Sequence, residues 1–99
     1  MPPDAVQVDP KHYKVELENE KVRVIRIRYG PHEKSPMHSH PDGIGIFLTE
    51  HHSKHPEPSG ASREVRAKAG EVLWFPAITH APENLSSQPM ELVFIELKK

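Results

Sequence analysis

Two histidines two residues apart, in the segment "MHSHPDG" (residues 37–43), are the first side chains that could do chemistry. Side chains at positions i and i+2 of a β-strand point to the same face, so His38 and His40 would point the same way. Two such imidazoles can both reach one metal ion, with each nitrogen roughly 2 Å from it. The pair is not sufficient evidence, because an isolated HxH pattern is more often two solvated polar side chains.

A third candidate ligand, His80, lies in the segment "GEVLWFPAITHAPEN" (residues 70–84). The pattern predicts a strand that ends at Pro76, a short turn, and a further strand that begins with His80. In an antiparallel barrel this strand can lie beside His38 and His40 and point inward with them. Three neutral imidazoles would leave coordination positions open, which distinguishes a catalytic or substrate-binding metal from a closed structural one.

The remaining histidines are expected to be solvated. His51, His52 and His55 lie in the polar, proline-rich segment 51–62, which shows no periodicity and is predicted to be a long hairpin loop. His32 is predicted in an exposed loop and His12 on the surface. No other catalytic group stands out: there is no cysteine, no serine lies in a nucleophile-elbow motif, and no glycine-rich phosphate loop is present.

The elements that must position these histidines are predicted to be short strands. Apolar residues alternate or run in short bursts bounded by Gly, Pro, Asn or Ser in residues 13–18, 21–30, 43–50, 63–70, 71–76 and 90–98. The alternation slips between Val24 and Ile25, which indicates either a bulge or a strand that is apolar on both faces. No helical crossover is visible, so the chain is predicted to be all-β with antiparallel strands. The aromatic residues Phe47, Trp74, Phe75 and Phe94 are expected to be mostly core.

The bulk composition favours one small domain. Ninety-nine residues with a formal charge of −1 predict a single domain over residues 1–99, with residues 1–10 as a loosely held N-terminal arm. The mixed charges argue against nucleic acid or a membrane as partner. No apolar run approaches a membrane span and the first residues do not resemble a signal peptide, so a cytoplasmic location is expected.

The last predicted strand, "MELVFIELK" (residues 90–98), carries large apolar side chains on both faces. A half-exposed strand would show one polar face. The second face should therefore be covered, either by the N-terminal segment or by a second copy of the chain. A homodimer is accordingly expected.

The two histidine segments together resemble the two sequence motifs of the cupin superfamily, G-x5-HxH-x3,4-E-x6-G and G-x5-PxG-x2-H-x3-N. Gly30, His38 and His40 correspond to the first motif, although seven residues separate Gly30 from His38. The second motif is matched by Gly70, Pro76, His80 and Asn84, without the glycine after the proline. The resemblance implies a small antiparallel jelly-roll β-barrel, and Asn84 is expected to tie a turn.

The first motif departs from the family pattern at its glutamate, because Gly43, Ile44 and Gly45 stand where a carboxylate ligand is expected. The site could then be a three-histidine site, as in the thiol-dioxygenase branch of the superfamily. Alternatively, a carboxylate such as Asp42, Glu33 or Glu83 substitutes, or the site has lost its metal.

The resemblance therefore implies a divalent metal ion held by His38, His40 and His80, iron(II) first and zinc, manganese or nickel as alternatives. Its partner would be a small molecule that the protein binds or acts on. The ion would either activate dioxygen, as in a dioxygenase-type enzyme, or polarise the substrate as a Lewis acid. The first alternative is a non-catalytic module that binds a sugar or an organic acid. The second is a structural or oligomer-forming protein in which the histidines are relics.

Overall fold

The computed structural model describes residues 3–98, which form ten short strands and one helical turn. The elements are α1 (Ala5–Val8), β1 (Tyr13–Glu18), β2 (Val22–Tyr29), β3 (His38–His40), β4 (Gly43–Phe47), β5 (His51–Pro56), β6 (Ser62–Ala67), β7 (Val72–Phe75), β8 (Ile78–His80), β9 (Glu83–Asn84) and β10 (Met90–Leu97). Within this part of the chain no helix is long and apolar enough to cross a membrane.

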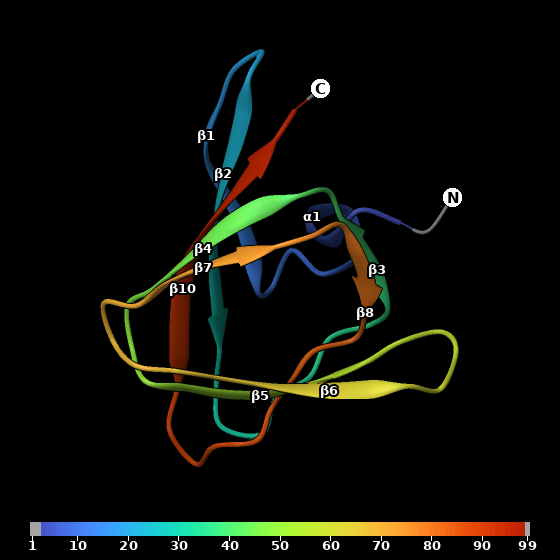
Figure 1. The fold of residues 1–99 in the computed structure, drawn as a ribbon, viewed down its shortest axis with the longest axis vertical. Helices are drawn as coiled ribbons and strands as arrows, with labels where there is room; N and C mark the ends of the chain where they lie inside the picture. Colours follow the sequence, from blue (N-terminus) through green and yellow to red (C-terminus); the bar gives the residue numbers. More distant parts are fainter. Residues whose placement is uncertain (1–2, 99) are drawn as a thin grey trace.

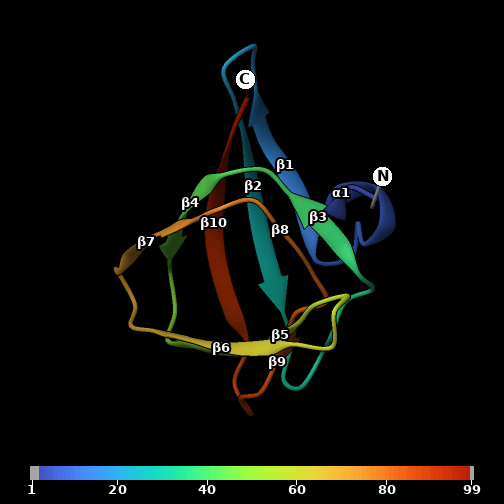
Figure 2. The same ribbon diagram turned by 45° about the vertical axis from the view of Figure 1, so that its right-hand side comes forward.

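The strands form three antiparallel sheets that enclose one interior. The largest sheet has the order β1-β2-β10-β4-β7, a second has the order β6-β5-β9, and β3 pairs with β8. The β4–β7 end of the large sheet lies across the interior from β5 and β6, and β3–β8 closes the space at one side (Figure 1). Figure 2 shows β2 and β10 running behind this interior. The all-β, antiparallel barrel predicted from the sequence is confirmed.

The core is built from side chains that alternate along the strands of the large sheet. Met90, Leu92 and Phe94 of β10 are at most 7% exposed, while the residues between them are only half-buried. Ile25 of β2 and Phe47 of β4 are at most 1% exposed and belong to the same cluster. Burial of one such side chain stabilises the fold by about 1.5–3 kcal/mol.

The predicted bulge exists, but on the neighbouring strand. The pairing of β1 with β2 shifts between Val15 and Leu17, so that Glu16 is the extra residue opposite Val24 and Ile25. The β2–β10 pairing runs through this level without interruption. The slip in the pattern of β2 therefore marks the place where its partner strand bends.

The N-terminal segment is packed against the barrel rather than loosely held. Residues 1–2 of the predicted arm lie outside the described residues. From there on, Ala5 is fully buried, Asp4 forms an ion pair with Arg23, and Ser39 donates its backbone N–H to the carbonyl oxygen of Pro3.

The prediction that His12 lies on the surface is also wrong. Its ring is buried between the carboxylates of Asp9 and Glu33, because both ring nitrogens find acceptors there.

Segment 51–62, predicted to be a loop, is mostly strand. Residues 51–56 form β5, which pairs with β6 from His51 opposite Ala67 to Pro56 opposite Ser62. The turn occupies only residues 57–61. The exposed position of His32 and the turn-tying role of Asn84 are confirmed, since the Asn84 amide donates to the carbonyl oxygens of Gly30 and Gln88.

Candidate metal centre

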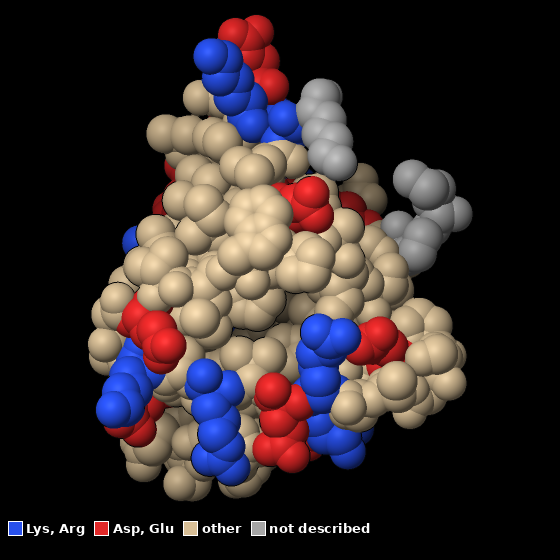
Figure 3. All heavy atoms as spheres, in the orientation of Figure 1, with Lys and Arg blue, Asp and Glu red and all other residues tan. Residues whose placement is uncertain are grey.

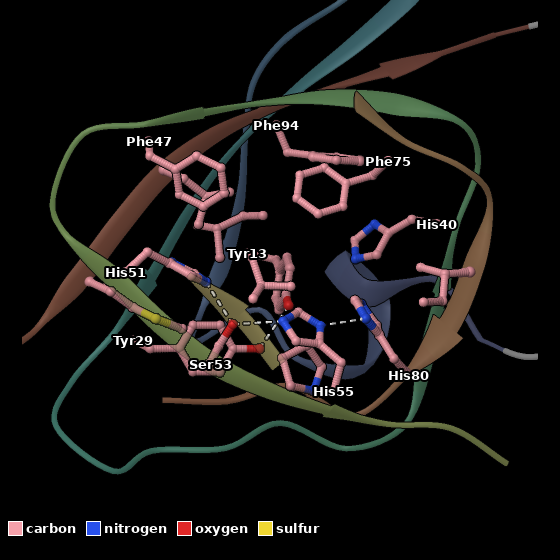
Figure 4. A pocket seen from close by; sticks show the side chains of 16 residues that line it. Tyr13, Tyr29, His40, Phe47, His51, Ser53, His55, Phe75, His80 and Phe94 are labelled. Carbon is pink, nitrogen blue, oxygen red and sulfur yellow. Dashed lines mark hydrogen bonds between the residues drawn. The ribbon is translucent and has the colours of Figure 1, made fainter. Parts of the chain in front are cut away.

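The three motif histidines meet inside the barrel. The pairing of β3 with β8 places His38 directly opposite His80, and the alternation along β3 turns His40 to the same side. One ring nitrogen from each of the three lies within 4.8 Å of the others, and the side chains are between 0% and 7% exposed. In Figure 4 the rings of His40 and His80 point into the same space. The structure therefore brings together all three predicted ligands.

Hydrogen bonds fix the rings of His38 and His40 in one tautomer each. The Nδ1 of His38 lies 2.9 Å from the carbonyl oxygen of Pro36, which can only accept, so Nδ1 carries the hydrogen. The Nδ1 of His40 lies 2.8 Å from a carboxylate oxygen of Glu96 and must donate in the same way. Both rings consequently direct an Nε2 lone pair into the site.

Glu96 is a residue of the site that the sequence analysis missed. It is 3% exposed and also accepts a hydrogen bond of 2.9 Å from Arg23, which in turn pairs with Asp4. The signal was present in the sequence: Glu96 continues the inward-facing series Met90, Leu92 and Phe94 at the same spacing. A carboxylate on an otherwise apolar strand face calls for a partner, because an unpaired buried charge is costly.

His80 is held by residues of the segment that was predicted to be a loop. Its Nδ1 lies 2.9 Å from Nδ1 of His55, whose Nε2 lies 2.6 Å from the hydroxyl oxygen of Ser53. The same hydroxyl lies 2.6 Å from Nε2 of His51 (Figure 4). We call His51, Ser53, His55 and His80 the histidine chain. The prediction that His51 and His55 are solvated is wrong, because β5 turns both rings inward.

Four buried histidines, His38, His51, His55 and His80, are neutral at physiological pH. Burial lowers the pKa of His38 to about 4 and that of His80 to about 2, and the neighbouring imidazoles add a smaller repulsion of positive charge. Burial likewise lowers the pKa of His51 and His55 to about 4. A neutral imidazole is the form that binds a metal, so His38 and His80 need no deprotonation before an ion enters.

A small cavity adjoins the three rings. It has a volume of about 60 Å³, enough for roughly five water-sized groups. Aromatic rings form one wall and the histidine chain another, and no Lys, Arg, Asp or Glu of the described residues lines it (Figure 4). The lining residues are Tyr13, Ile27, Tyr29, His40, Phe47, His51, Ser53, His55, Val65, Phe75, Ile78, His80, Pro82, Met90, Leu92 and Phe94.

A surface hollow adjoins this cavity between β6 and β7. It shares His55, Phe75 and His80 with the interior space, and its charged lining residues are Arg63, Glu64 and Arg66. Figure 3 shows this hollow in the middle of the molecule, with charged side chains of both signs below it. The hollow and the interior cavity therefore lie next to each other, with His55, Phe75 and His80 between them.

No family model matches the chain. No curated protein matches it either. Among solved structures, a cupin domain from Bordetella pertussis Tohama I is similar over 100% of this chain and 98% of its own, with 25% identity and a TM-score of 0.80. The chain has the cupin fold.

Two further structures show how widely this chain shares its fold. A cupin superfamily protein from Desulfitobacterium hafniense DCB-2 has 13% identity and a TM-score of 0.64, and covers 88% of this chain and 76% of its own. The polyketide cyclase RemF from Streptomyces resistomycificus has 14% identity and the same TM-score of 0.64, and covers 88% of this chain and 64% of its own. The fold is thus found in an enzyme, but these identities establish the fold alone.

The missing motif glutamate leaves space that aromatic rings fill. A Cβ added at Gly43 would lie 2.6 Å from both Phe94 Cζ and the carbonyl oxygen of Ile95. At Gly45 it would lie 2.8 Å from Phe75 Cε2. Gly45 and Gly43 thus leave room for the rings of Phe75 and Phe94 in the interior, at the level where the first sequence motif would have its glutamate.

The carboxylates considered as substitutes do not join the histidines. Glu33 accepts hydrogen bonds from Lys11 and from the backbone N–H of Gly30, and Asp42 accepts one from the backbone N–H of Ala77. Within residues 3–98, the group with metal-binding geometry contains the three histidines and none of Glu33, Asp42 and Glu83. The donor set is three imidazole nitrogens.

Two tyrosines complete the polar part of the cavity. The hydroxyl oxygens of Tyr13 and Tyr29 lie 2.7 Å apart, and the ring of Tyr13 packs edge-on against His38 with centroids 4.9 Å apart. Burial raises the pKa of Tyr13 well above its usual value of 10.0. Burial also raises the pKa of Tyr29, so both phenols stay protonated. One hydroxyl donates to the other, which leaves a single O–H free to donate to a bound molecule.

Proposed function

We propose that this protein holds one divalent metal ion through Nε2 of His38, His40 and His80, and that it binds and transforms a small molecule beside the ion. The observation that carries this proposal is a pair of orphaned atoms. The Nε2 atoms of His38 and His80 are buried and have no hydrogen-bond partner among residues 3–98; the third such atom of these residues, Nδ1 of His51, lies at the far end of the histidine chain. A buried polar atom left unpaired costs about 1–3 kcal/mol, and a metal ion at their common focus would remove that cost.

The donor set indicates which ions fit. Imidazole nitrogens suit iron, zinc, nickel and copper, whereas ions that prefer oxygen would lack their ligands here. Three protein ligands leave positions for a substrate, and we propose iron(II), with zinc or nickel as the alternatives. Manganese, also expected from the sequence, prefers oxygen ligands and fits this donor set less well. When bound, iron(II) would supply redox chemistry with dioxygen, and zinc would supply Lewis acidity.

The charge balance of the cavity favours an organic acid over a sugar as the bound molecule. No carboxylate of the described residues lines the cavity or joins the ligand set, so the charge of a divalent ion would be balanced by an anionic ligand. The walls are mostly apolar and offer few partners for the many hydroxyl groups of a sugar. We propose a small carboxylate or a similar anion, with an apolar body that contacts Phe47, Phe75 and Phe94.

The chain's own residues would then bind, orient and shield this molecule. The hydroxyl of Tyr13 or Tyr29 donates a hydrogen bond to it, and the aromatic wall excludes water from the side facing β4. Arg63 and Arg66 at the rim attract an anion to the hollow. None of these contacts needs a charged group inside the barrel.

A non-catalytic binding module is the second candidate, and one observation favours it. Burial keeps His51, His55 and His80 neutral, and no carboxylate base of the described residues lines the cavity. General acid–base catalysis would therefore have to come from the bound water or substrate. Product analysis with small organic acids in the presence of iron(II) and dioxygen separates the two candidates.

The metal site itself is tested by metal analysis of purified protein and of the His80→Ala variant. We expect about one equivalent of a divalent ion in the wild type and a large loss in the variant. Exposed His32 provides the control, because His32→Ala should leave the metal content unchanged. Equal metal content in wild type and His80→Ala would end the proposal.

A further inference from the structure

The histidine chain differs from the supports of the other two ligands in one chemical respect. The carbonyl oxygen of Pro36 and the carboxylate of Glu96 can only accept a hydrogen bond, so each dictates the tautomer of its ligand. His80 instead faces Nδ1 of another imidazole, which donates in one tautomer and accepts in the other. The tautomer of His80 therefore depends on residues beyond its immediate partner.

The distances between the hydrogen-bonding atoms allow two arrangements of hydrogens along the histidine chain. In the first, Nδ1–H of His80 donates to His55, Nε2–H of His55 donates to Ser53, and the Ser53 hydroxyl donates to Nε2 of His51. In the second, every donor and acceptor is exchanged, so that His55 donates to His80. Both arrangements keep all three imidazoles neutral, and burial keeps the pKa of His51 and His55 at about 4.

Only the first arrangement is compatible with a metal ion. It leaves a lone pair on Nε2 of His80, whereas the second places an N–H there, directed at His38 and His40. In the second arrangement the Nε2–H of His80 would point at the ring nitrogens of His38 and His40. Because Nε2 would then have no free lone pair, His80 could not ligate an ion. The state of the histidine chain thus decides whether the third ligand is available.

We propose that His55 is a positioning residue for the ligand His80: it accepts the Nδ1 hydrogen of His80 and so leaves the Nε2 lone pair facing the ion. Ser53 and His51 hold His55 in the tautomer that this requires. The inference rests on the proposed metal site and adds to it a remote determinant of affinity, three residues long and located on β5. Metal binding selects the first arrangement and thereby sets the tautomer of His51 at the far end of the histidine chain.

The experiment uses zinc(II), which is diamagnetic, as probe on the full chain. Calorimetry measures zinc affinity for the wild type, His55→Leu and His55→Gln. We expect His55→Leu to lose about 10- to 100-fold in affinity, as is typical when a partner of a metal-ligating histidine is removed. His55→Gln should recover part of the loss, because the amide oxygen of glutamine can accept from Nδ1 of His80. The matched control is His52→Gln, which lies on the opposite face of β5, bonds to Glu64 and should bind zinc as the wild type does.

A second measurement does not depend on any variant folding. Long-range ¹H–¹⁵N correlation spectra of the zinc-loaded wild type report which nitrogen of each histidine carries the hydrogen. We expect the hydrogen on Nδ1 in His80 and on Nε2 in His55. Ser53→Ala breaks the next link and should mix the two tautomers of His55 in the metal-free protein.

The outcomes separate the inference from the metal site beneath it. Absence of zinc binding by the wild type would overturn both. Normal zinc affinity in His55→Leu, or a zinc-loaded wild type with the hydrogen of His55 on Nδ1, would overturn the inference and leave the three-histidine site standing. Loss in His55→Leu together with recovery in His55→Gln supports it.

Discussion

Each of the three candidate ligands is held by a different kind of partner. His38 donates to a backbone carbonyl, His40 to the carboxylate of Glu96, and His80 contacts the imidazole of His55. A carboxylate makes its histidine a stronger electron donor than a carbonyl does, because it stabilises positive charge on the ring. The three ligands should therefore contribute unequally to metal affinity, with His40 the strongest donor.

Replacing the carboxylate of Glu96 tests this ranking. The Glu96→Gln variant keeps an oxygen that can accept from His40, but it removes the negative charge and weakens the bond from Arg23. We expect zinc affinity to fall by about tenfold, at the lower end of the usual range for such partners. Calorimetry measures the change, and Glu18→Gln, which removes an exposed partner of Lys98, serves as control. Unchanged affinity in Glu96→Gln would mean that the carboxylate only balances Arg23.

At the scale of the elements, β4 matters because it has two glycines on its inward face. Gly43 faces backbone as well as the ring of Phe94, while Gly45 meets only the ring of Phe75 and a methyl group of Leu92. A side chain can move aside more readily than a strand can. Gly43 and Gly45 should therefore differ in how well they tolerate a larger side chain.

Alanine at each position measures this difference. Gly43→Ala should lower the free energy of unfolding by about 1–3 kcal/mol, because its Cβ would overlap the carbonyl oxygen of Ile95 and force β4 away from β10. Gly45→Ala should cost less, since the ring of Phe75 is half-buried and can rotate. Denaturant unfolding followed by circular dichroism gives both values. The reverse order would show that the ring is held more firmly than the strand.

The sequence predicted strands best where apolar residues alternate, as in β1 and β10, and it predicted the HxH pair on one strand face. It failed at β5, where the inward positions are His51, Ser53 and His55 rather than apolar residues. These inward residues do recur at every second position, but a search for alternating hydrophobic residues does not detect them because they are polar. Glu96 was missed for a related reason, because the pairing of its carboxylate with His40 joins residues far apart in the chain.

At the scale of the whole molecule, the outer face of the large sheet is unusually apolar. One row across all five strands consists of Leu17, Val24, Ile95, Ile44 and Trp74, which lie opposite one another in register. Leu17 and Trp74, at its ends, are 53% and 55% exposed. The N-terminal segment does not provide the predicted cover for this face, since α1 lies against β1 and β3. The homodimer remains a prediction, and this face is where it should be tested.

A charged residue in the row should prevent the dimer. We expect sedimentation of the wild type to show dimer formation as concentration rises, and Trp74→Glu to remain a monomer, because burial of an unpaired carboxylate is costly. Ala61→Glu, in the exposed turn between β5 and β6, should behave as the wild type does. A wild type that stays monomeric at all concentrations rules out the homodimer.

The buried histidines also make the stability of the metal-free protein depend on pH. The folded pKa values of His38, His51, His55 and His80 lie between about 2 and 4, below the ordinary 6.5. Between pH 6.5 and 4 the unfolded chain therefore binds more protons than the folded one, and stability falls as pH falls. We expect a loss of roughly 1 kcal/mol or more per pH unit in this window.

Urea unfolding at pH 7.5 and pH 5.0 measures this dependence. His32→Gln should keep it, because His32 is exposed in the folded protein. An unchanged urea midpoint at the two pH values would contradict this expectation. It would show that the histidine rings can be protonated inside the folded barrel, with water or negative charges beside them.

The ion pair between Arg23 and Asp4 connects the first residues of the chain to the barrel interior. Arg23 shares its guanidinium between Asp4 and Glu96, and Glu96 orients His40. Proteolytic trimming of only a few N-terminal residues would free that guanidinium to draw Glu96 away from the imidazole. Such a clipped protein would keep every strand yet retain its ion less firmly, so the choice of which terminus carries an affinity tag bears directly on how much metal survives purification.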